Sequence, residues 1–352
     1  MTAPVDVLVI GGGQAGLAAS WRLVEAGASH VVIDASQDVG DSWRRRYHSL
    51  TLFTPRSLSA LPGLPVSGDP DGYASRIEFA DYLAAYAGKH RLPVMSGTSV
   101  TRLVADPSGF AAELDGGTQV HARAVIVCTG PFQQSVVPQF SRAFADDIVQ
   151  LTVGDDRNPM TAGPGTVLVV GDGASGRDIA VDLARTHKVV LATGKRRRLF
   201  PERILGQSTW TWMDRLGLLS ASAGSPVGRI MQATDPFPNR GRSFRALRAV
   251  GVDIRPRLHG ADGRIAIFAD GSRAYVGAII WATGYRNRDH WIEIDLGSPG
   301  LFFLGRPWQR NRASGLILGA SRDSVPVAKA VLDHLRQSLP QPPRRANEWR
   351  NA

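Results

Sequence analysis

The chain has 352 residues, of which 43% are hydrophobic and 20% charged, with 38 glycines, 22 prolines and one cysteine. This length allows two or three domains with cores of their own, and the apolar content excludes a disordered chain. The single cysteine, Cys128, excludes an intramolecular disulfide, a CxxC redox pair and a cysteine-rich zinc site. Any redox chemistry must therefore use a bound cofactor.

The formal net charge is +10, and arginine supplies almost all of the excess. A positive charge favours anionic ligands. Because the arginines are scattered and no basic module interleaved with aromatic residues is present, we expect no nucleic-acid partner. No segment approaches the roughly 20 apolar residues of a membrane helix, so we expect a cytoplasmic protein that does not bind membranes. The 8 histidines show no metal-ligand spacing, so we expect no metal site.

The first motif is a glycine turn between a strand and a helix. The β-branched run at residues 5–10 leads into the sequence GGGQAG, and a helix-like stretch follows at residues 17–26. In a dinucleotide-binding turn, Gly11 makes the tight bend, Gly13 lets the backbone approach a pyrophosphate and Gly16 lets helix pack on strand. The turn predicts cofactor contacts at Gly11, Gly13, Gln14, Ala15 and Gly16.

An acid follows the next strand. Residues 30–33 form a β-branched run that ends at Asp34, about 20 residues beyond the glycines, where a carboxylate can accept both hydroxyls of an adenosine ribose. Asp34 and Ala35 are therefore predicted cofactor residues. The alternative is that Asp34 only caps the strand end.

The same pattern recurs 160 residues later. A strand at residues 166–170 leads into GDGASG, and a helix is predicted at residues 177–185. The predicted contacts are Gly171, Gly173, Ala174, Ser175 and Gly176. Two such units imply two different dinucleotides bound by two similar domains.

The second unit carries cations where the first carries an acid. Its next strand, at residues 189–192, runs into Thr193, Gly194 and then Lys195, Arg196, Arg197 and Arg198. Cations suit a 2′-phosphate, which a carboxylate would repel, so the sequence favours NADPH over NADH. Thr193, Lys195, Arg196 and Arg197 are the predicted contacts, and a solvated charged loop is the alternative.

Two further strands end in a Thr-Gly turn, at Thr129-Gly130 and at Thr283-Gly284. Such a turn lets the backbone meet a cofactor edge or another domain, so we predict that Thr129 and Gly130 contact the first dinucleotide and that Thr283 and Gly284 contact NADPH. A helix predicted from about residue 325, preceded by Asp323, would direct its positive end at a cofactor carbonyl. We therefore predict an α/β protein with two Rossmann-like domains. The first is discontinuous (1–150 and 290–340), the second spans 155–285, and 341–352 form a disordered tail.

Taken together, these segments resemble the flavin-containing monooxygenases, in particular the compact bacterial CzcO-like group. The resemblance rests on GGGQAG at Gly11, GDSW at residues 40–43, VCTGPF at residue 127, the second glycine turn with its helix, KRRRLFPERILG at Lys195 and WATGY at residue 281. It implies FAD in the first domain and NADPH in the second, in a thioredoxin-reductase-like arrangement. It also implies that reduced FAD reacts with O2 to give a C4a-(hydro)peroxyflavin, which transfers one oxygen atom to a substrate.

The resemblance places Ser42 and Trp43 at the FAD. It gives Trp43, Arg44, Tyr47, Phe53 and Gln150 as candidates near the reacting ring. Two positions depart from the family. The stretch Phe-x-Gly-x-x-x-His maps onto residues 144–150, so Asp146 and Gln150 replace its glycine and histidine. Phe53 stands where many members carry asparagine. The SLTLFTP version resembles plant indole-pyruvate monooxygenases and the flavin monooxygenases of bacterial arsenic-resistance clusters.

Three functions are compatible with these residues. The first is an NADPH-dependent monooxygenase acting on a small nitrogen-, sulfur- or metalloid-containing or carbonyl substrate, with O2 as co-substrate and a homodimer as the assembly considered. The second is an NADPH oxidase or reductase that passes electrons to a quinone, a protein or O2. The third is a redox sensor that holds FAD and turns over slowly. Trp210 and Trp212 are candidates for a substrate gate, and packing residues are the alternative.

Overall fold

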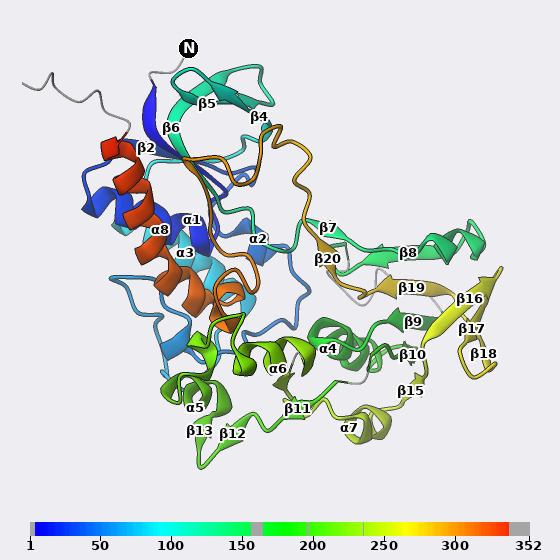
Figure 1. Ribbon diagram of the computed structural model, residues 1–352. Helices are drawn as coiled ribbons and strands as arrows, with labels where there is room; N and C mark the ends of the chain where they lie inside the picture. Colours follow the sequence, from blue (N-terminus) through cyan, green and yellow to red (C-terminus); the bar gives the residue numbers. More distant parts are fainter. Residues whose placement is uncertain (1–3, 156–164, 196, 235, 338–352) are drawn as a thin grey trace, which may run out of the picture.

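Two β-sheets, each containing a strand that leads into a glycine turn, organise the chain into two lobes (Figure 1). The computed structural model describes residues 4–155, 165–195, 197–234 and 236–337. The predicted disordered tail at 341–352 lies outside these residues. The two parallel-sheet units confirm the predicted α/β class with two dinucleotide-binding domains.

The first sheet has the strand order β3-β2-β1-β6-β5-β4, and β21 pairs with β6. Its strands are β1 Val5–Ile10, β2 His30–Ile33, β3 Val94–Met95, β4 Val100–Asp106, β5 Gly109–Leu114, β6 Gln119–Val127 and β21 Leu301–Phe303. β1, β2, β3, β6 and β21 are mutually parallel, whereas β5 runs antiparallel to both of its neighbours, β6 and β4. Ile10 pairs with both Ile33 and Val127, so β1, β2 and β6 end together at one edge.

Three helices cover the first sheet. α1 Gln14–Glu25 and α8 Ile317–Gln337 lie side by side on one face (Figure 1), and α3 Arg76–Lys89 packs beyond α1. Leu23 of α1 and Val331 of α8 share a buried core with Val9. The return of β21 and α8 to this sheet brings residues 301–337 beside the first glycine turn.

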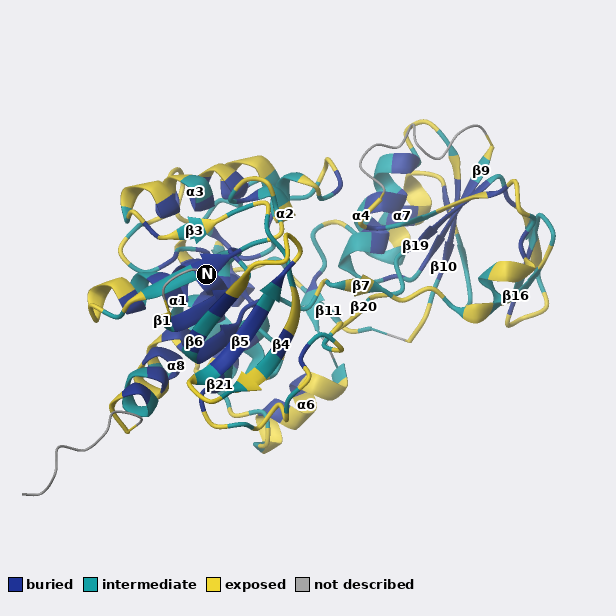
Figure 2. Cartoon of the chain, turned by 90° about the horizontal axis from the view of Figure 1, so that it is seen from above, coloured by how far each residue is buried: buried dark blue, intermediate teal, exposed yellow. Residues whose placement is uncertain are grey.

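The second sheet is entirely parallel, in the order β15-β10-β9-β19-β8. Its strands are β8 Val149–Thr152, β9 Thr166–Val170, β10 Lys188–Ala192, β15 Val252–Arg255 and β19 Ala278–Trp281, and the helices α4 Ala174–Leu183 and α7 Phe244–Ala249 pack on it. Figure 2 shows these buried strands as a lobe of their own. The expected boundary at residue 150 is too late, because β8 pairs with β19 and already belongs to this sheet.

Smaller elements complete the described chain. A three-stranded antiparallel sheet, β16 Leu258–Asp262, β17 Ile265–Phe268 and β18 Arg273–Tyr275, covers the second lobe. An insertion holds β11 Leu199–Phe200, β12 Arg203–Ile204, β13 Gln207–Ser208, α5 Thr209–Arg215, the 3-10 helix η4 Leu218–Ser220, α6 Pro226–Thr234 and β14 Phe237–Pro238. The remaining short elements are α2 Asp41–Arg44 and the 3-10 helices η1 Arg56–Leu58, η2 Gln139–Ala143 and η5 Arg312–Gly315.

Two strands connect the lobes, β7 Gln134–Ser135 and β20 Tyr285–Arg286, and they pair antiparallel with each other (Figure 1). The chain therefore crosses between the lobes twice at one place. None of the helices in the described part of the chain is long and apolar enough to cross a membrane.

Candidate active site

The first glycine turn has the geometry that a bound pyrophosphate requires. Gly11 has φ +106°, and a Cβ there would lie 2.6 Å from the Cys128 carbonyl oxygen. A Cβ at Gly16 would lie 1.8 Å from the Gly11 carbonyl oxygen, so only glycine allows α1 to pack this close to the turn. Nothing lies within 4 Å of a Cβ built on Gly13. The turn is therefore closed on its protein side and open at Gly13.

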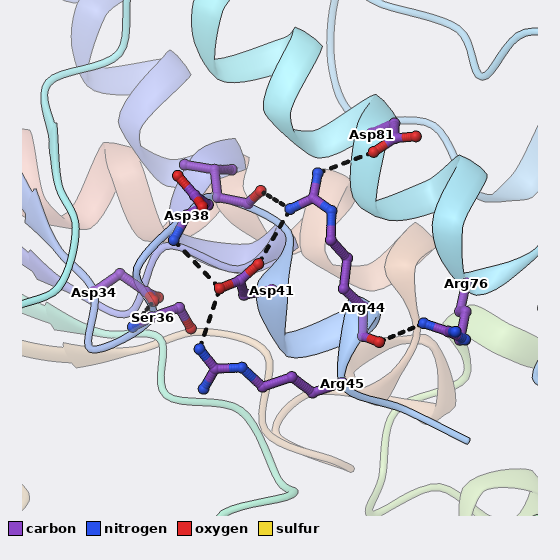
Figure 3. Close-up of polar contacts among 9 residues, drawn as sticks. Asp34, Ser36, Asp38, Asp41, Arg44, Arg45, Arg76 and Asp81 are labelled. Carbon is purple, nitrogen blue, oxygen red and sulfur yellow. Dashed lines mark hydrogen bonds and ion pairs between the residues drawn. The ribbon is translucent and has the colours of Figure 1, made fainter. Parts of the chain in front are cut away.

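Asp34 joins the end of β2 to this turn. Its Oδ2 accepts a hydrogen bond from the Gly12 amide at 2.5 Å, and its Oδ1 accepts from the Ser36 amide at 2.7 Å. Figure 3 shows Asp34 and Ser36 beside the loop that precedes α2. Each carboxylate oxygen keeps a second lone pair for a ligand hydroxyl. Asp34 thus holds the first glycine turn against the end of β2 and also lines a cleft.

That cleft, called here the long cleft, contains about 1410 Å³ of empty space along the carboxyl edge of the first sheet. Ligands of parallel α/β sheets bind at this edge. Ten of the predicted FAD residues line it: Gly11, Gly13, Gln14, Ala15, Asp34, Ala35, Ser42, Trp43, Thr129 and Gly130. Residues from two strand ends, two turns and α2 are therefore brought to one surface, with Gly16 packed beneath it.

Polar contacts hold the α2 segment against α1 and α3. The Trp43 indole donates from Nε1 to Gln14 Oε1 at 3.2 Å, and its ring packs edge-on against Phe79 with centroids 4.9 Å apart. Arg44 donates to the Val39 carbonyl oxygen, to Asp41 and to Asp81 of α3 (Figure 3). These contacts fix Trp43 where the long cleft ends.

The N-terminus of α8 closes another side of the long cleft. Ser314, Gly315, Leu316 and Ala320 line it. The expected start of this helix near residue 325 was wrong, because α8 already begins at Ile317. Asp323 therefore lies two turns inside the helix, 5% exposed and 3.6 Å from the Arg310 guanidinium, and it is not among the residues that line the long cleft.

The second glycine turn repeats the geometry of the first. Gly171 has φ +107°, and a Cβ there would lie 2.4 Å from the Ala282 carbonyl oxygen. A Cβ at Gly176 would lie 1.9 Å from the Gly171 carbonyl oxygen, whereas Gly173 has no atom within 4 Å of its Cβ position. Ala174 and Ser175 begin α4, so the helix N-terminus faces the same opening.

The strand end beside the second turn carries no acid. The Thr193 hydroxyl donates to the Arg255 carbonyl oxygen at 3.0 Å, and Lys195 Nζ donates to the Ala233 carbonyl oxygen at 3.0 Å. Arg197 is half-buried. Arg196 lies outside the described residues. These contacts tie two of the four predicted phosphate contacts to neighbouring backbone.

The Thr-Gly turn after β19 serves the connection between the lobes. The Thr283 hydroxyl donates to the Val136 carbonyl oxygen, and the Val136 amide donates to the Gly284 carbonyl oxygen at 2.9 Å. Neither Thr283 nor Gly284 lines the long cleft or the cleft described next. Their contacts therefore hold the crossover that includes β7 and β20.

A second cleft of about 800 Å³ lies between the lobes and is called here the interdomain cleft. Trp43, Arg46 and Phe132 line both clefts, so the two are contiguous. The lining is mainly aromatic and apolar with a few charged groups, and its other members are Tyr47, Leu50, Thr51, Leu52, Phe53, Ala174, Ser175, Arg177, Asp178, Phe237, Pro238, Arg240 and Arg242. It links the N-terminus of α4 to the long cleft.

Of the predicted near-flavin residues Phe53 and Gln150, only Phe53 lines a cleft. Phe53 lines the interdomain cleft and packs on Trp210 with ring centroids 5.5 Å apart. Gln150 lies on β8 in the second sheet, where Trp281 donates to its side chain at 3.0 Å, and it lines neither cleft. The expectation for Gln150 was wrong, because the polypeptide has left the first lobe before residue 149.

Of the two gate candidates, Trp210 is a buried packing residue and Trp212 is partly exposed. Trp210 is 1% exposed and lies behind Phe53, against Phe200 and the Arg312 guanidinium. Trp212 is held by a hydrogen bond from its Nε1 to the Ile204 carbonyl oxygen. Within the described residues, no group of three or more His, Cys, Asp or Glu side chains is placed to hold a metal ion.

Residues 8–203 match the family described as Pyridine nucleotide-disulphide oxidoreductase. The chain belongs to this family. A CzcO-like oxidoreductase from Geobacillus kaustophilus is 39% identical over 347 residues, covering 94% of this chain and 99% of the relative. A flavin-containing monooxygenase from Stenotrophomonas maltophilia has a TM-score of 0.78 at 26% identity, covering 95% of this chain and 99% of that one.

An indole-3-pyruvate monooxygenase from Oryza sativa is 26% identical over 371 residues, covering 92% of this chain and 90% of the relative. These similarities confirm the relationship to flavin monooxygenases that the motifs predict. The family description names a pyridine nucleotide, and the relative from Stenotrophomonas maltophilia is described as flavin-containing, which agrees with the predicted pair of FAD and NADPH.

The family description names disulphide chemistry, but this chain has a single cysteine and so lacks an internal pair of thiols. Its one cysteine, Cys128, is buried at the end of β6 and lines the long cleft. Burial raises the pKa of the Cys128 thiol, so it stays protonated. A single thiol cannot form a disulfide within the chain.

The sequence patterns do not indicate the contacts that join the two lobes. Tyr47 belongs to the loop after α2, yet its ring is buried in the core of the second lobe, and its hydroxyl donates to Asp178 Oδ2 at 3.2 Å. Burial raises the Tyr47 pKa, so the hydroxyl remains a donor. Arg242 donates to Asp178 Oδ1 at 2.9 Å, and Arg240 donates to the Thr51 carbonyl oxygen at 3.2 Å.

The run of three arginines after Trp43 divides into separate roles. Arg44 and Arg45 pair with Asp41, whereas the Arg46 guanidinium lies 4.4 Å above the Phe132 ring, where the clefts meet. Burial lowers the Arg46 pKa from its usual value, although a guanidinium stays charged at any physiological pH. A motif of three adjacent cations could not show which one enters the site.

Proposed function

We propose that this chain is an NADPH-dependent flavin monooxygenase that transfers one oxygen atom of O2 to a small nitrogen-, sulfur- or metalloid-containing or carbonyl substrate. The observation that supports this proposal most is the pair of open glycine turns. The first lines the long cleft, and the second leads into Ala174 and Ser175, which line the contiguous interdomain cleft. One strand end beside them carries Asp34, and the other carries Thr193 followed by cations. Two dinucleotides of different kinds fit this arrangement.

The residues of the long cleft fit FAD. The open face of Gly13 and the N-terminus of α1 suit a pyrophosphate, and Asp34 suits the adenosine ribose. Trp43, Ser42, Thr129, Gly130 and the N-terminus of α8 would hold the other half. When bound, FAD accepts a hydride from NADPH and, once reduced, activates O2. The chain's own task is to hold the two cofactors in register and exclude water.

The residues of the interdomain cleft fit that task. Apolar rings from both lobes, including Phe53, Phe132 and Phe237, limit the space that water can occupy. The Tyr47–Asp178–Arg242 contacts join the loop after α2 to α4, and so set the separation of the two binding turns. The N-terminus of α4 and Arg46 present positive charge to an anionic nucleotide that spans the clefts.

The test is an oxygen balance on the FAD-loaded enzyme. NADPH oxidation, H2O2 release and product formation from isotopically labelled O2 are measured with five probes: methyl phenyl sulfide, trimethylamine, a trivalent organoarsenical, cyclohexanone and indole-3-pyruvate. We expect at least one probe to gain one labelled oxygen atom per NADPH oxidised, with an equal decrease in H2O2. If H2O2 accounts for all the NADPH with every probe, the monooxygenase proposal fails.

The second candidate function is an NADPH oxidase or reductase, and Phe53 favours it. The ring of Phe53 lines the interdomain cleft at the position where the resemblance places an asparagine in many members. A phenyl group offers no hydrogen bond to a bound cofactor or to an oxygen species. The same oxygen balance separates the two functions, since an oxidase yields H2O2 and no labelled product.

The cationic strand end should decide the choice between NADPH and NADH. Replacing Arg196 and Arg197 with glutamine removes two charges from the proposed 2′-phosphate contact. We expect the KM for NADPH to rise about tenfold or more, with a less than about twofold change for NADH. Steady-state kinetics with both cofactors checks this, and Arg273→Gln, an exposed arginine on β18 of the same lobe, is the control. Equal effects on both cofactors would place the phosphate elsewhere.

A further inference from the structure

A buried ion pair lies inside the second glycine turn, and the first turn has nothing like it. The Asp172 and Arg177 side chains are 4% and 3% exposed, with Arg177 Nη2 2.9 Å from Asp172 Oδ2. Arg177 Nε also donates to the Asp172 carbonyl oxygen at 2.9 Å. A buried pair of this kind keeps its charges only because each compensates the other.

In each lobe, one hydrogen bond between an amide and a carboxylate joins the glycine turn to the end of the next strand, but the two lobes place the donor and the acceptor on opposite sides. In the first lobe, the middle residue of the turn, Gly12, donates its amide to Asp34 at the strand end. In the second lobe, the middle residue is Asp172, and its Oδ1 accepts from the amide of Gly194 at the strand end, at 3.0 Å. The carboxylate has moved from the strand end to the turn, while the bridge between them is kept.

Sterics explain why each turn has only one bridging acid. A Cβ on Gly12 would lie 3.0 Å from Asp34 Cβ and 3.2 Å from its Oδ2, so a side chain there conflicts with a strand-end acid. The second turn carries Thr193 at the position matching Asp34, which leaves room for Asp172. The strand end then has no carboxylate of its own to repel a 2′-phosphate.

Arg177 cancels the charge that this exchange brings into the turn. Without a partner, the Asp172 carboxylate would be an uncompensated negative charge beside the nucleotide. Arg177 neutralises it, donates from Nη1 to the Arg242 carbonyl oxygen at 2.7 Å, and stacks 4.4 Å above the Phe244 ring. It therefore also anchors the segment that forms one wall of the interdomain cleft.

We propose that the Asp172–Arg177 pair is a specificity-determining positioning pair, which holds the turn to the strand end without presenting net negative charge to the 2′-phosphate. The proposal rests on the proposed function of the second lobe as the NADPH site. It assigns Arg177 an effect on nucleotide choice through Asp172, in addition to the cations that follow Thr193.

The experiment measures binding of adenosine 2′,5′-bisphosphate and of adenosine 5′-diphosphate to the FAD-loaded enzyme by calorimetry. Three variants are compared with wild type: Arg177→Met, Asp172→Asn and the double variant. Asparagine keeps an oxygen for the Gly194 amide and loses the charge. FAD content and thermal unfolding report on the fold of each variant.

For Arg177→Met, we expect Kd for the 2′-phosphorylated nucleotide to rise about tenfold, with a less than about twofold change for the other nucleotide. Asp172→Asn should keep the preference or increase it, and the double variant should return the ratio of the two Kd values to within about threefold of wild type. If Arg177→Met does not fold, an increased preference in Asp172→Asn together with a wild-type ratio in the double variant supports the proposal.

Equal weakening of both nucleotides by Arg177→Met would show a structural role only and overturn the proposal. A ratio in the double variant that stays as low as in Arg177→Met would overturn it too, as would an Asp172→Asn variant that prefers the 2′-phosphate less than wild type does. A wild-type enzyme that binds both nucleotides equally is a different result, because it contradicts the NADPH preference itself.

Discussion

A Gly13→Leu variant should fold normally and lose its FAD. Gly13 has φ −76° and ψ −172°, extended backbone that any residue adopts, and nothing lies within 4 Å of its Cβ position. The new side chain therefore strains nothing in the protein, but it projects into the long cleft at the proposed pyrophosphate position. We expect at least about tenfold less bound FAD, equivalent to a loss of about 1.4 kcal/mol or more in binding.

The ratio of flavin to protein absorbance after desalting measures this, and circular dichroism reports the fold. Gly88→Leu is the matched control, because Gly88 is exposed on α3 and also has no atom within 4 Å of its Cβ position. That variant should keep its FAD. A yellow Gly13→Leu protein with one FAD per chain would show that the pyrophosphate lies elsewhere.

A Gly173→Leu variant should retain FAD and lose reduction by NADPH. Gly173 has φ −68° and ψ −175° and the same open surroundings, but it lies at the N-terminus of α4 in the other lobe. Leucine there would occupy the proposed NADPH pyrophosphate position. We expect the rate of anaerobic flavin reduction at a fixed, subsaturating NADPH concentration to fall about tenfold or more.

Stopped-flow absorbance follows that reduction, and dithionite, which does not need the nucleotide site, serves as the control reductant. Dithionite should reduce Gly173→Leu at the wild-type rate. Gly13→Leu and Gly173→Leu are thus reciprocal, since one empties the flavin site and the other blocks its electron supply. Normal reduction of Gly173→Leu by NADPH would exclude this turn as the nucleotide site.

The two lobes differ in net charge. Residues 149–285 carry 19 Lys and Arg against 11 Asp and Glu, whereas residues 1–148 carry 11 against 14. The second lobe therefore holds most of the positive charge. A field of this sign attracts an anionic nucleotide and weakens as ionic strength rises. The general preference for anions inferred from composition is thus concentrated in the lobe of the proposed NADPH turn.

Local sequence was sufficient for the two glycine turns because their constraints are local. Gly11 and Gly171 have positive φ directly after a strand, a conformation that favours glycine. Gly16 and Gly176 lie on a helix that packs against a backbone oxygen of the turn, where a side chain would clash. Asp34 was also predictable, since the acid follows the next strand at a regular distance. The sequence GDGASG shows that an acid, Asp172, stands in the middle of the second turn, but it does not show that Arg177 pairs with this acid.

The wrong predictions, for Gln150 and Asp323, concern the positions at which strands and helices begin. The family motif matched to residues 144–150 predicts Gln150 near the flavin, whereas the strand that carries Gln150 pairs with β19 in the second lobe. Asp323 was expected before a helix, yet α8 begins at Ile317 and includes Pro326 within it. Helix starts without a recognisable capping residue are difficult to locate from sequence, because packing on α1 stabilises the first turns.

The sequence by itself determined the chemistry available to this protein: two dinucleotide turns, opposite charge at their strand ends, and a single cysteine that excludes an internal thiol pair. Only the tertiary structure decided which residues share a surface. Tyr47 reaches Asp178 across 131 positions of sequence, and Arg46 rather than its two neighbours meets Phe132. Turn geometry depends on residues a few positions apart, whereas a cleft between lobes depends on how two separately folded units dock.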